Sequence, residues 1–288
     1  MSYSKFWTAL ILCASAGLVL AQEKDKPAPG YEDLDNDFKI DTGSTFRMRV
    51  EVDAGKVRVS RGQSKDRVKA RLFYDREEYE HTFRYNEKRN ALEIILDKTR
   101  WIGKHDNHEA GELDLELPTG GDMDLDFKIK AGEIEMQLGG LSLADFSLET
   151  IAGEVNLDFD EPNQREMTNL FLNTKIGESN FRRLGNARFR NAEIDGGIGQ
   201  LTIDFSGDLL KDAIANVDLD IGETTIVLPR ESGTRLSISK FMFLSHFEPP
   251  RDLRKDGRYY YSQNYDDAKQ NFQLSISAGI GECRIKQD

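Results

Sequence analysis

The sequence has 288 residues and a formal net charge of −12 at pH 7, with 31% charged and 38% hydrophobic side chains. An acidic chain of this kind repels polyanions, so we predict no nucleic-acid partner. The same charge disfavours simple adsorption to an anionic lipid surface.

The N-terminus has the pattern of an export signal. Lys5 precedes an apolar run over residues 6–20, and Val19 and Ala21 occupy the −3 and −1 positions of a small-residue cleavage site. The run is about fifteen residues long, whereas a membrane-spanning helix needs roughly twenty. We therefore predict a signal peptide over residues 1–21 and export to the periplasm or the cell exterior.

Cleavage would leave a mature chain that starts at Gln22 and has no integral membrane span. Its single cysteine, Cys283, would allow neither an intrachain disulfide nor a cysteine-built metal site. An uncleaved N-terminal anchor and a lipid attached to Cys13 are the alternatives.

Residues 22–37 are polar and charged, with two prolines, and this composition predicts a linker.

Residues 38–112 predict an irregular β-rich part that is continuous with the repeats after it. Alternating apolar residues occur over 68–74 and 92–96, on either side of a charged stretch. His105 and His108 lie in a polar segment that reads as a loop. Two histidines three positions apart share a face only on a helix, so we predict no metal site there.

From residue 113 a unit repeats along the chain: alternating apolar residues, a bend with glycine followed by a polar residue, and a second alternating run. The glycines of five copies, separated by 21, 24, 22 and 23 residues, are Gly132, Gly153, Gly177, Gly199 and Gly222. A weaker copy contains Gly55, and the last contains Gly281. Alternation with a period of two predicts strands that bury one face. Glycine at a fixed point supplies a positive φ, or a close approach that a side chain would obstruct.

Two architectures fit this repeat. In a β-solenoid each unit is one coil, and the glycines stack about 4.8 Å apart. In an antiparallel meander or barrel each unit is a hairpin. Hairpins favour Asn-Gly or Asp-Gly turns, which occur only at 195–196 and 256–257. We therefore predict an all-β solenoid over 113–288 with coils of about 22 residues, in which the five glycines form one column.

The Gly-Glu coils, the tyrosine-rich segment 257–265 and the ending at 277–282 together resemble the toast-rack family. That family includes proposed adhesin domains and the C-terminal domains of LiaF-type cell-wall stress-response proteins. The resemblance is clear over 113–288 and weaker over 38–112. It implies a right-handed single-stranded β-helix and an adhesion-like or envelope-stress role. A signal peptide replaces the several membrane helices of LiaF, so the resemblance does not extend to direct membrane signalling.

The interval from Gly222 to Gly281 is too long for one coil and predicts a capping loop near 240–270. Its aromatic cluster consists of Tyr259, Tyr260, Tyr261 and Tyr265. One interpretation is a ligand or partner surface, because exposed tyrosines stack on sugars or on partner side chains. The other is a cover for the last coil, since a solenoid must protect its open ends.

Stacked coils would also align the residue that follows each glycine. The resulting acidic column would contain Glu133, Glu154, Glu178 and Glu223, with Gln200 between the last two. Like charges opposite one another destabilise a sheet. The column therefore has basic neighbours, holds a cation or cationic partner, or consists of ordinary solvated corner residues.

Catalytic motifs do not emerge from the sequence. It has no G-x-S-x-G elbow, P-loop or dinucleotide fingerprint, and the acidic run at 33–37 lacks the glycine and glutamate of a calcium loop. We predict no catalytic residues, cofactor or metal, and a non-enzymatic cell-envelope binding, adhesion or scaffold protein whose partner is an envelope protein or a glycan. The alternative is an extracellular polysaccharide-acting enzyme on a β-helix scaffold, which a groove of carboxylates with perturbed pKa values would favour.

Overall fold

A computed structural model describes residues 30–99, 111–240, 245–248 and 252–287. The N-terminal strands are β1 (Tyr31–Lys39), β2 (Phe46–Arg61), β3 (Arg67–Asp75), β4 (Tyr79–Asn86), β5 (Ala91–Lys98) and β6 (Glu112–Leu117). The repeated strands are β7 (Met123–Gln137), β8 (Leu143–Asp158), β9 (Met167–Arg182), β10 (Phe189–Asp204) and β11 (Ala213–Leu228). The C-terminal strands are β12 (Gly233–Lys240), β13 (Ser245–Glu248), β14 (Arg254–Asp256), β15 (Tyr259–Tyr261) and β16 (Asn271–Gln287). Two short 3-10 helices are η1 (Glu87–Arg89) and η2 (Leu184–Ala187).

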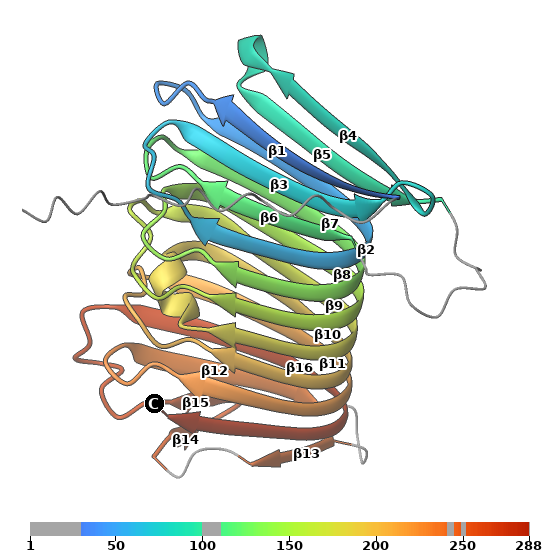
Figure 1. The fold of residues 1–288 in the computed structure, drawn as a ribbon. Coiled ribbons are helices and arrows are strands. Elements are labelled where there is room, and N and C mark those ends of the chain that lie inside the picture. The colour runs from blue at the N-terminus through green and yellow to red at the C-terminus, as the bar shows by residue number, and fades with distance from the viewer. Residues whose placement is uncertain (1–29, 100–110, 241–244, 249–251, 288) are drawn as a thin grey trace, which may run out of the picture.

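The described residues form one 16-stranded sheet that stacks along a single axis (Figure 1). Strands β2, β7, β8, β9, β10, β11 and β16 follow one another in space, and every neighbouring pair among them is parallel. The fold is therefore all-β and has the arrangement of a β-solenoid, and the hairpin alternative is wrong for these strands. The predicted signal peptide, His105 and His108 lie outside the described residues.

Each long strand curves around one edge of the stack, at the right in Figure 1. Along β8 the burial alternates, is interrupted by the exposed or half-buried residues 151–154, and then alternates again. We call the part before this interruption the first arm, the interruption the corner, and the part after it the second arm.

The predicted column of glycines is confirmed at the corner, and it extends to both ends. In register, one per strand, it contains Gly55, Gly132, Gly153, Gly177, Gly199, Gly222 and Gly281. All seven have φ between 130° and 155°. A Cβ on Gly153 would lie 1.9 Å from the carbonyl oxygen of Gly132, far inside van der Waals contact. Glycine is therefore required both by the positive φ and by the close approach of the neighbouring strand.

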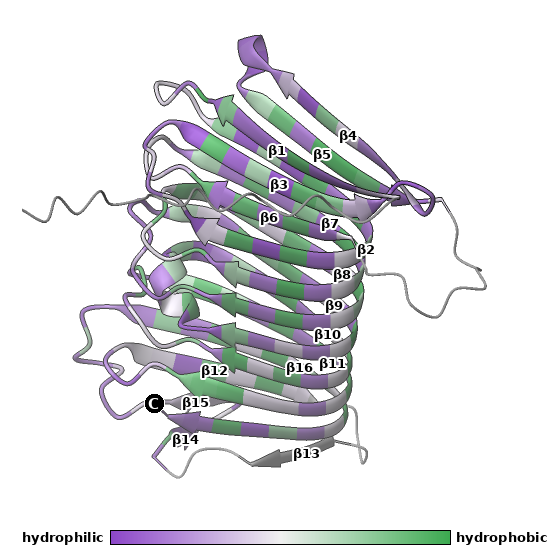
Figure 2. Ribbon diagram, in the orientation of Figure 1, coloured by the Kyte–Doolittle hydropathy of each residue, from purple (hydrophilic) through white to green (hydrophobic). Residues whose placement is uncertain are grey.

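The core lies between the two arms. Alternating apolar side chains of both arms are buried, and hydrophobic and hydrophilic residues alternate along the ribbons in Figure 2. The largest fully buried side chains include Phe127, Phe146, Phe159, Phe189, Phe205 and Phe272. Burial of each such side chain stabilises the fold by roughly 1.5–3 kcal/mol. Because the interior supplies this stability, the residues on the outer faces of the arms can be polar or charged.

At its N-terminal end the sheet divides into two branches. The first arm of β2 pairs with β5, and β5 pairs with β4. The second arm of β2 pairs with β6, which pairs with β3, and β3 pairs with β1. Phe38 on β1 packs against Phe83 and Tyr85 on β4, with ring centroids 6.1 Å and 5.8 Å apart. These aromatic contacts join the two branches and close this end.

The linker prediction is wrong from Tyr31 onward, because β1 begins there. Leu34 and Phe38 pack against the core on one side of this strand. On its other side, Asp33 accepts two hydrogen bonds of 2.9 Å from Arg71 on β3. A segment that is polar in composition is thus an edge strand whose carboxylates pair with a basic neighbour.

At the C-terminal end, β16 lies beside β11 although 42 residues separate them in sequence. The intervening chain supplies β12 to β15, which lie beyond β16. Strands β12 and β13 pair with the first and second arms of β16, and β15 and β14 extend the β12 branch. No helix among the described residues is long and apolar enough to cross a membrane.

Candidate functional site

Strand alternation divides the tyrosine cluster. Tyr260 lies directly opposite the buried Leu236 of β12 and packs against the core. Successive side chains of a strand point to opposite faces, so Tyr259 and Tyr261 face away from the core. The segment therefore contains one ring that covers the core and others that face outward.

The outward rings pack on one another and on arginines. Tyr259 and Tyr261 are 6.1 Å apart between ring centroids, and Tyr261 and Tyr265 are 4.9 Å apart, both in edge-to-face geometry. The guanidinium groups of Arg258 and Arg235 lie 4.8 Å and 5.1 Å from the centroid of Tyr259. These contacts fix the orientation of the rings. We call Tyr259, Tyr261 and Tyr265, with Arg235 and Arg258, the tyrosine face.

A groove leads from Tyr259 across the outer faces of the first arms of β12, β16, β11 and β10. Its polar lining includes Ser237, Ser275, Ser277, Asn216, Asp218 and Asp195. Because neighbouring strands are about 4.8 Å apart, successive coils add polar groups at regular steps along the stack. Burial raises the pKa of the Asp195 carboxyl; Lys175 opposes this, and the neighbouring Asp218 carboxylate adds to it.

The acidic column lies on the second-arm side of the corner. The register places in one line Glu133, Glu154, Glu178, Gln200 and Glu223, and continues it to Glu282. Lys56 on β2 precedes Glu133 in this line. The column is therefore basic at its N-terminal end and acidic beyond it.

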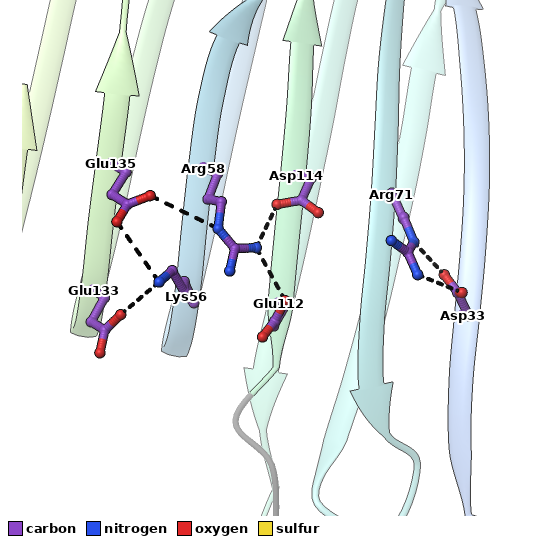
Figure 3. A network of polar contacts seen from close by, with 8 residues as sticks. All are labelled: Asp33, Lys56, Arg58, Arg71, Glu112, Asp114, Glu133 and Glu135. Carbon is purple, nitrogen blue, oxygen red and sulfur yellow. Dashed lines mark hydrogen bonds and ion pairs between the residues drawn. The ribbon is translucent and has the colours of Figure 1, made fainter. Parts of the chain in front are cut away.

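Lys56 neutralises the first glutamate of the column. Its Nζ lies 2.9 Å from Glu133 and 3.7 Å from Glu135, within a network that continues to Arg58 on the same strand (Figure 3). Arg58 also lies 2.9 Å from Asp114 on β6. Hydrogen bonding to Lys56 holds the pKa of Glu133 below its usual value, and the same contact raises the pKa of Lys56.

Further along, the glutamates have fewer partners. Glu154 accepts a hydrogen bond of 3.0 Å from Asn156, and Glu282 forms an ion pair with Arg284 at 2.7 Å. Glu178 and Glu223 are exposed and have no ion-pair or hydrogen-bond partner among the side chains that the structure describes. The negative charge of the column is therefore least compensated over β9 to β11.

A row of exposed isoleucines lies directly before the glycine column. In register on β9, β10, β11 and β16 are Ile176, Ile198, Ile221 and Ile280, with exposed fractions of 53%, 50%, 46% and 41%. The same position on β2, β7 and β8 holds Ala54, Ala131 and Ala152. We call the four isoleucines the corner ladder.

Sequence reasoning missed the corner ladder because it assigned apolar residues to the core. A signal was nevertheless present in the alternation. The buried side chains that are odd-numbered on one side of a glycine are even-numbered on the other side, or the reverse. On β11 the buried positions are Val217 and Leu219 before the glycine but Thr224 and Ile226 after it. Ile221 has the parity of the first arm but lies in the corner, where the alternation is broken.

The described residues contain no group of three or more His, Cys, Asp or Glu side chains able to hold a metal ion. Cys283 on β16 is buried and forms no disulfide. The chemistry that the arrangement offers is thus that of exposed surfaces: an aromatic face beside a polar groove, and an apolar ladder beside an acidic column.

The parallel stack and its glycine corner define a β-solenoid. A family comparison is more specific, because residues 28–179 match the N-terminal domain of toast_rack, just over half of the chain. The chain therefore belongs to the toast-rack family. The match includes the whole of the 38–112 part, where the sequence resemblance is weaker.

Two solved structures are similar but distant. A proposed cell adhesion protein from Clostridium sporogenes is 16% identical with a TM-score of 0.46, and the match covers 89% of this chain and 100% of that one. A proposed adhesin from Bacteroides fragilis is 12% identical with a TM-score of 0.45, over 89% and 97% of the two chains. No curated protein sequence matches the chain.

Proposed function

We propose that this protein is a non-enzymatic binding protein of the cell envelope, exported to the periplasm or cell surface, whose tyrosine face binds a glycan. The observation that carries the proposal is the row of three tyrosine rings in edge-to-face contact, the first of which, Tyr259, lines a polar groove. Membership in the toast-rack family and the predicted signal peptide support an envelope location.

The chemistry of the surface suits a sugar polymer. A tyrosine ring offers an apolar face to the C–H side of a sugar and a hydroxyl to its polar edge. The serine, asparagine and carboxylate side chains of the groove supply the hydrogen-bond donors and acceptors that sugar hydroxyls need. Because the rings are held by arginines and by one another, binding loses little side-chain entropy.

The orientation of the groove also suits a polymer. It crosses four strands of one continuous sheet, so a chain lying along the stack would meet repeated polar groups rather than one enclosed pocket. The cationic groups of Arg235 and Arg258 lie at the tyrosine end, and the carboxylates lie at the other. An adhesion, scaffold or envelope-stress role would follow from binding such a polymer at the cell envelope.

The test is binding of residues 22–288 to insoluble peptidoglycan and to soluble acidic and neutral polysaccharides, measured by co-sedimentation and calorimetry. The double variant Tyr259→Ala/Tyr261→Ala is expected to lose about tenfold in affinity, since each aromatic contact contributes roughly 0.5–1.5 kcal/mol. Tyr31→Ala, which removes a ring stacked on Phe73 on β3, is the matched control. Equal binding by the double variant and the native protein would reject the tyrosine face as the site.

The enzyme alternative has one specific observation in its favour. Asp195 and Asp218 are direct neighbours on β10 and β11, and the pKa of Asp195 is raised. Retaining glycosidases use two carboxyl groups about 5 Å apart, one of them with a raised pKa. Release of reducing ends from a bound polysaccharide that Asp195→Asn abolishes, while binding persists, would establish this alternative. The binding proposal predicts no release by either protein.

A further inference from the structure

The corner ladder is a concentrated apolar surface. Six large hydrophobic side chains are exposed among the described residues, and four of them are the members of this ladder. A single exposed isoleucine is ordinary on a protein surface. Four in register, about 4.8 Å apart on neighbouring strands, form a continuous apolar strip, which is the kind of surface that marks an interaction site.

The strip is bordered by glycine and then by negative charge. Each isoleucine is followed by a glycine of the column, which has no side chain to screen it. Next come Glu178, Gln200, Glu223 and Glu282. On the other border Asp220 precedes Ile221 and Lys175 precedes Ile176. A partner that covers the isoleucines therefore meets Glu178 and Glu223, which have no ion-pair partner among the described side chains.

We propose that the corner ladder binds an amphipathic helix of a partner protein, with apolar residues on the isoleucines and basic residues along the acidic column. The site is separate from the tyrosine face and does not rest on the glycan proposal. Charge complementarity identifies this occupant. A second copy would bring its own acidic column and a net charge of −12, and an anionic membrane would be repelled in the same way.

The spacing of the ladder favours a helix over an extended strand. A helix presents an apolar residue on one face about every 5.4 Å, and the ladder repeats about every 4.8 Å, so four contacts drift by less than about 2 Å. A strand lying along the ladder repeats the same face about every 6.6 Å and loses register within two steps. In addition, the corner residues of β10 and β11 have sheet neighbours on both sides, so an added strand has no free edge there.

The probe is a fluorescently labelled 18-residue peptide of leucine and lysine with leucine at helical spacing, added to residues 22–288 and followed by anisotropy. We expect binding that weakens with salt and is at least tenfold weaker in Ile198→Ser/Ile221→Ser. Both side chains are exposed, so this variant is expected to keep the native circular dichroism spectrum and unfolding transition. The variant Glu178→Gln/Glu223→Gln should bind several-fold more weakly and with a shallower salt dependence.

Four comparisons make the test decisive. A peptide of the same composition with leucine at every second position should bind poorly; equal binding would overturn the helical occupant. If the isoleucine variant binds as well as the native protein, the peptide is held by charge alone and the ladder is not the site. If the native protein instead dimerises through the isoleucines in sedimentation experiments, the occupant is a second copy and the proposal is overturned. Tyr259→Ala/Tyr261→Ala should leave peptide binding unchanged, which separates this test from that of the glycan proposal.

Discussion

The two halves of the corner share a backbone but differ in their side chains. Over β2, β7 and β8 the residue before the glycine is alanine, and the flanking charges of β2 and β7 pair, Lys56 with Glu133 and Asp53 with Lys130. Over β9, β10, β11 and β16 it is isoleucine, and Glu178 and Glu223 have no ion-pair partner among the described side chains. The glycine column fixes the shape of the corner, so the positions beside it can vary without changing the fold. The alanine half pairs most of its flanking charges within the chain, whereas the isoleucine half presents the apolar surface for which we propose a partner.

The largest expected effect falls on what the two halves share. Gly132→Ala and Gly199→Ala should each destabilise the protein by about 3 kcal/mol or more, since both combine a positive φ with a steric clash. Their Cβ atoms would lie 1.7 Å and 1.9 Å from the carbonyl oxygens of Gly55 and Gly177. Urea unfolding followed by circular dichroism measures the loss.

Gly257→Ala is the matched control for these variants. Gly257 also has a positive φ, of 60°, but a Cβ there would have no atom within 4 Å. Gly257→Ala should lower the free energy of unfolding only by the cost of a positive φ at a residue with a side chain, about 1–2 kcal/mol. If Gly199→Ala were no worse than Gly257→Ala, the close approach of neighbouring strands would not be what requires glycine. If only one of Gly132→Ala and Gly199→Ala lost much stability, the two halves of the corner would not have the same backbone geometry.

Much of this fold could be predicted from the sequence because its determinants are periodic. Alternation defined the strands, and the regular recurrence of glycine defined the stacking and thereby the acidic column. The N-terminal part was harder, since β1 has the composition of a linker. Its strand character depends on pairing with β3, which is distant in sequence and supplies Arg71 as the partner of Asp33. The branching of β2 toward β5 and β6 likewise depends on pairings that no local pattern specifies.

The candidate surfaces were only partly predictable. The tyrosine cluster could be found from composition, but its division into one inward and several outward rings required the register of β15 against β12. The exposure of Ile176, Ile198 and Ile221 contradicts the usual rule that isoleucine is buried. It follows from the positive φ of the next residue, which interrupts the alternation so that the side chain before each glycine lies on the outside of the corner.

An intermediate effect is expected when the alanine half is given the side chains of the isoleucine half. Ala131→Ile/Ala152→Ile lengthens the corner ladder from four rungs to six and should tighten binding of the leucine–lysine peptide several-fold, by roughly 1 kcal/mol. Both alanines are half-buried at the corner, so the free energy of unfolding should change by less than about 0.5 kcal/mol. The control is Ala131→Ser/Ala152→Ser, which changes the same positions without apolar area. If the isoleucine variant binds the peptide with unchanged affinity, isoleucine side chains alone do not turn the alanine half into a binding surface.

The smallest expected effect concerns charge. The pKa of Glu133 is lowered by Lys56, so the folded state releases this proton more readily than the unfolded chain. The resulting stability is present above the unfolded glutamate pKa, about 4.3, and is lost as the pH falls through the lower folded value. Glu133→Gln should therefore unfold at a slightly lower urea concentration than the native protein at neutral pH and low salt. The difference should disappear in acid and in roughly 1 M salt, where the screening length is about 3 Å.

Glu178→Gln is the matched change in the other half, at the same position of the column but without a described partner. Removing its charge relieves repulsion from Glu154 and breaks no ion pair, so at neutral pH and low salt it should leave stability unchanged or slightly raised. If Glu133→Gln lowers the stability and Glu178→Gln raises it, only the N-terminal half of the column uses its charges for its own stability. Equal losses would mean that Glu178 has a stabilising partner in the folded protein, which would leave less negative charge available to a basic helix.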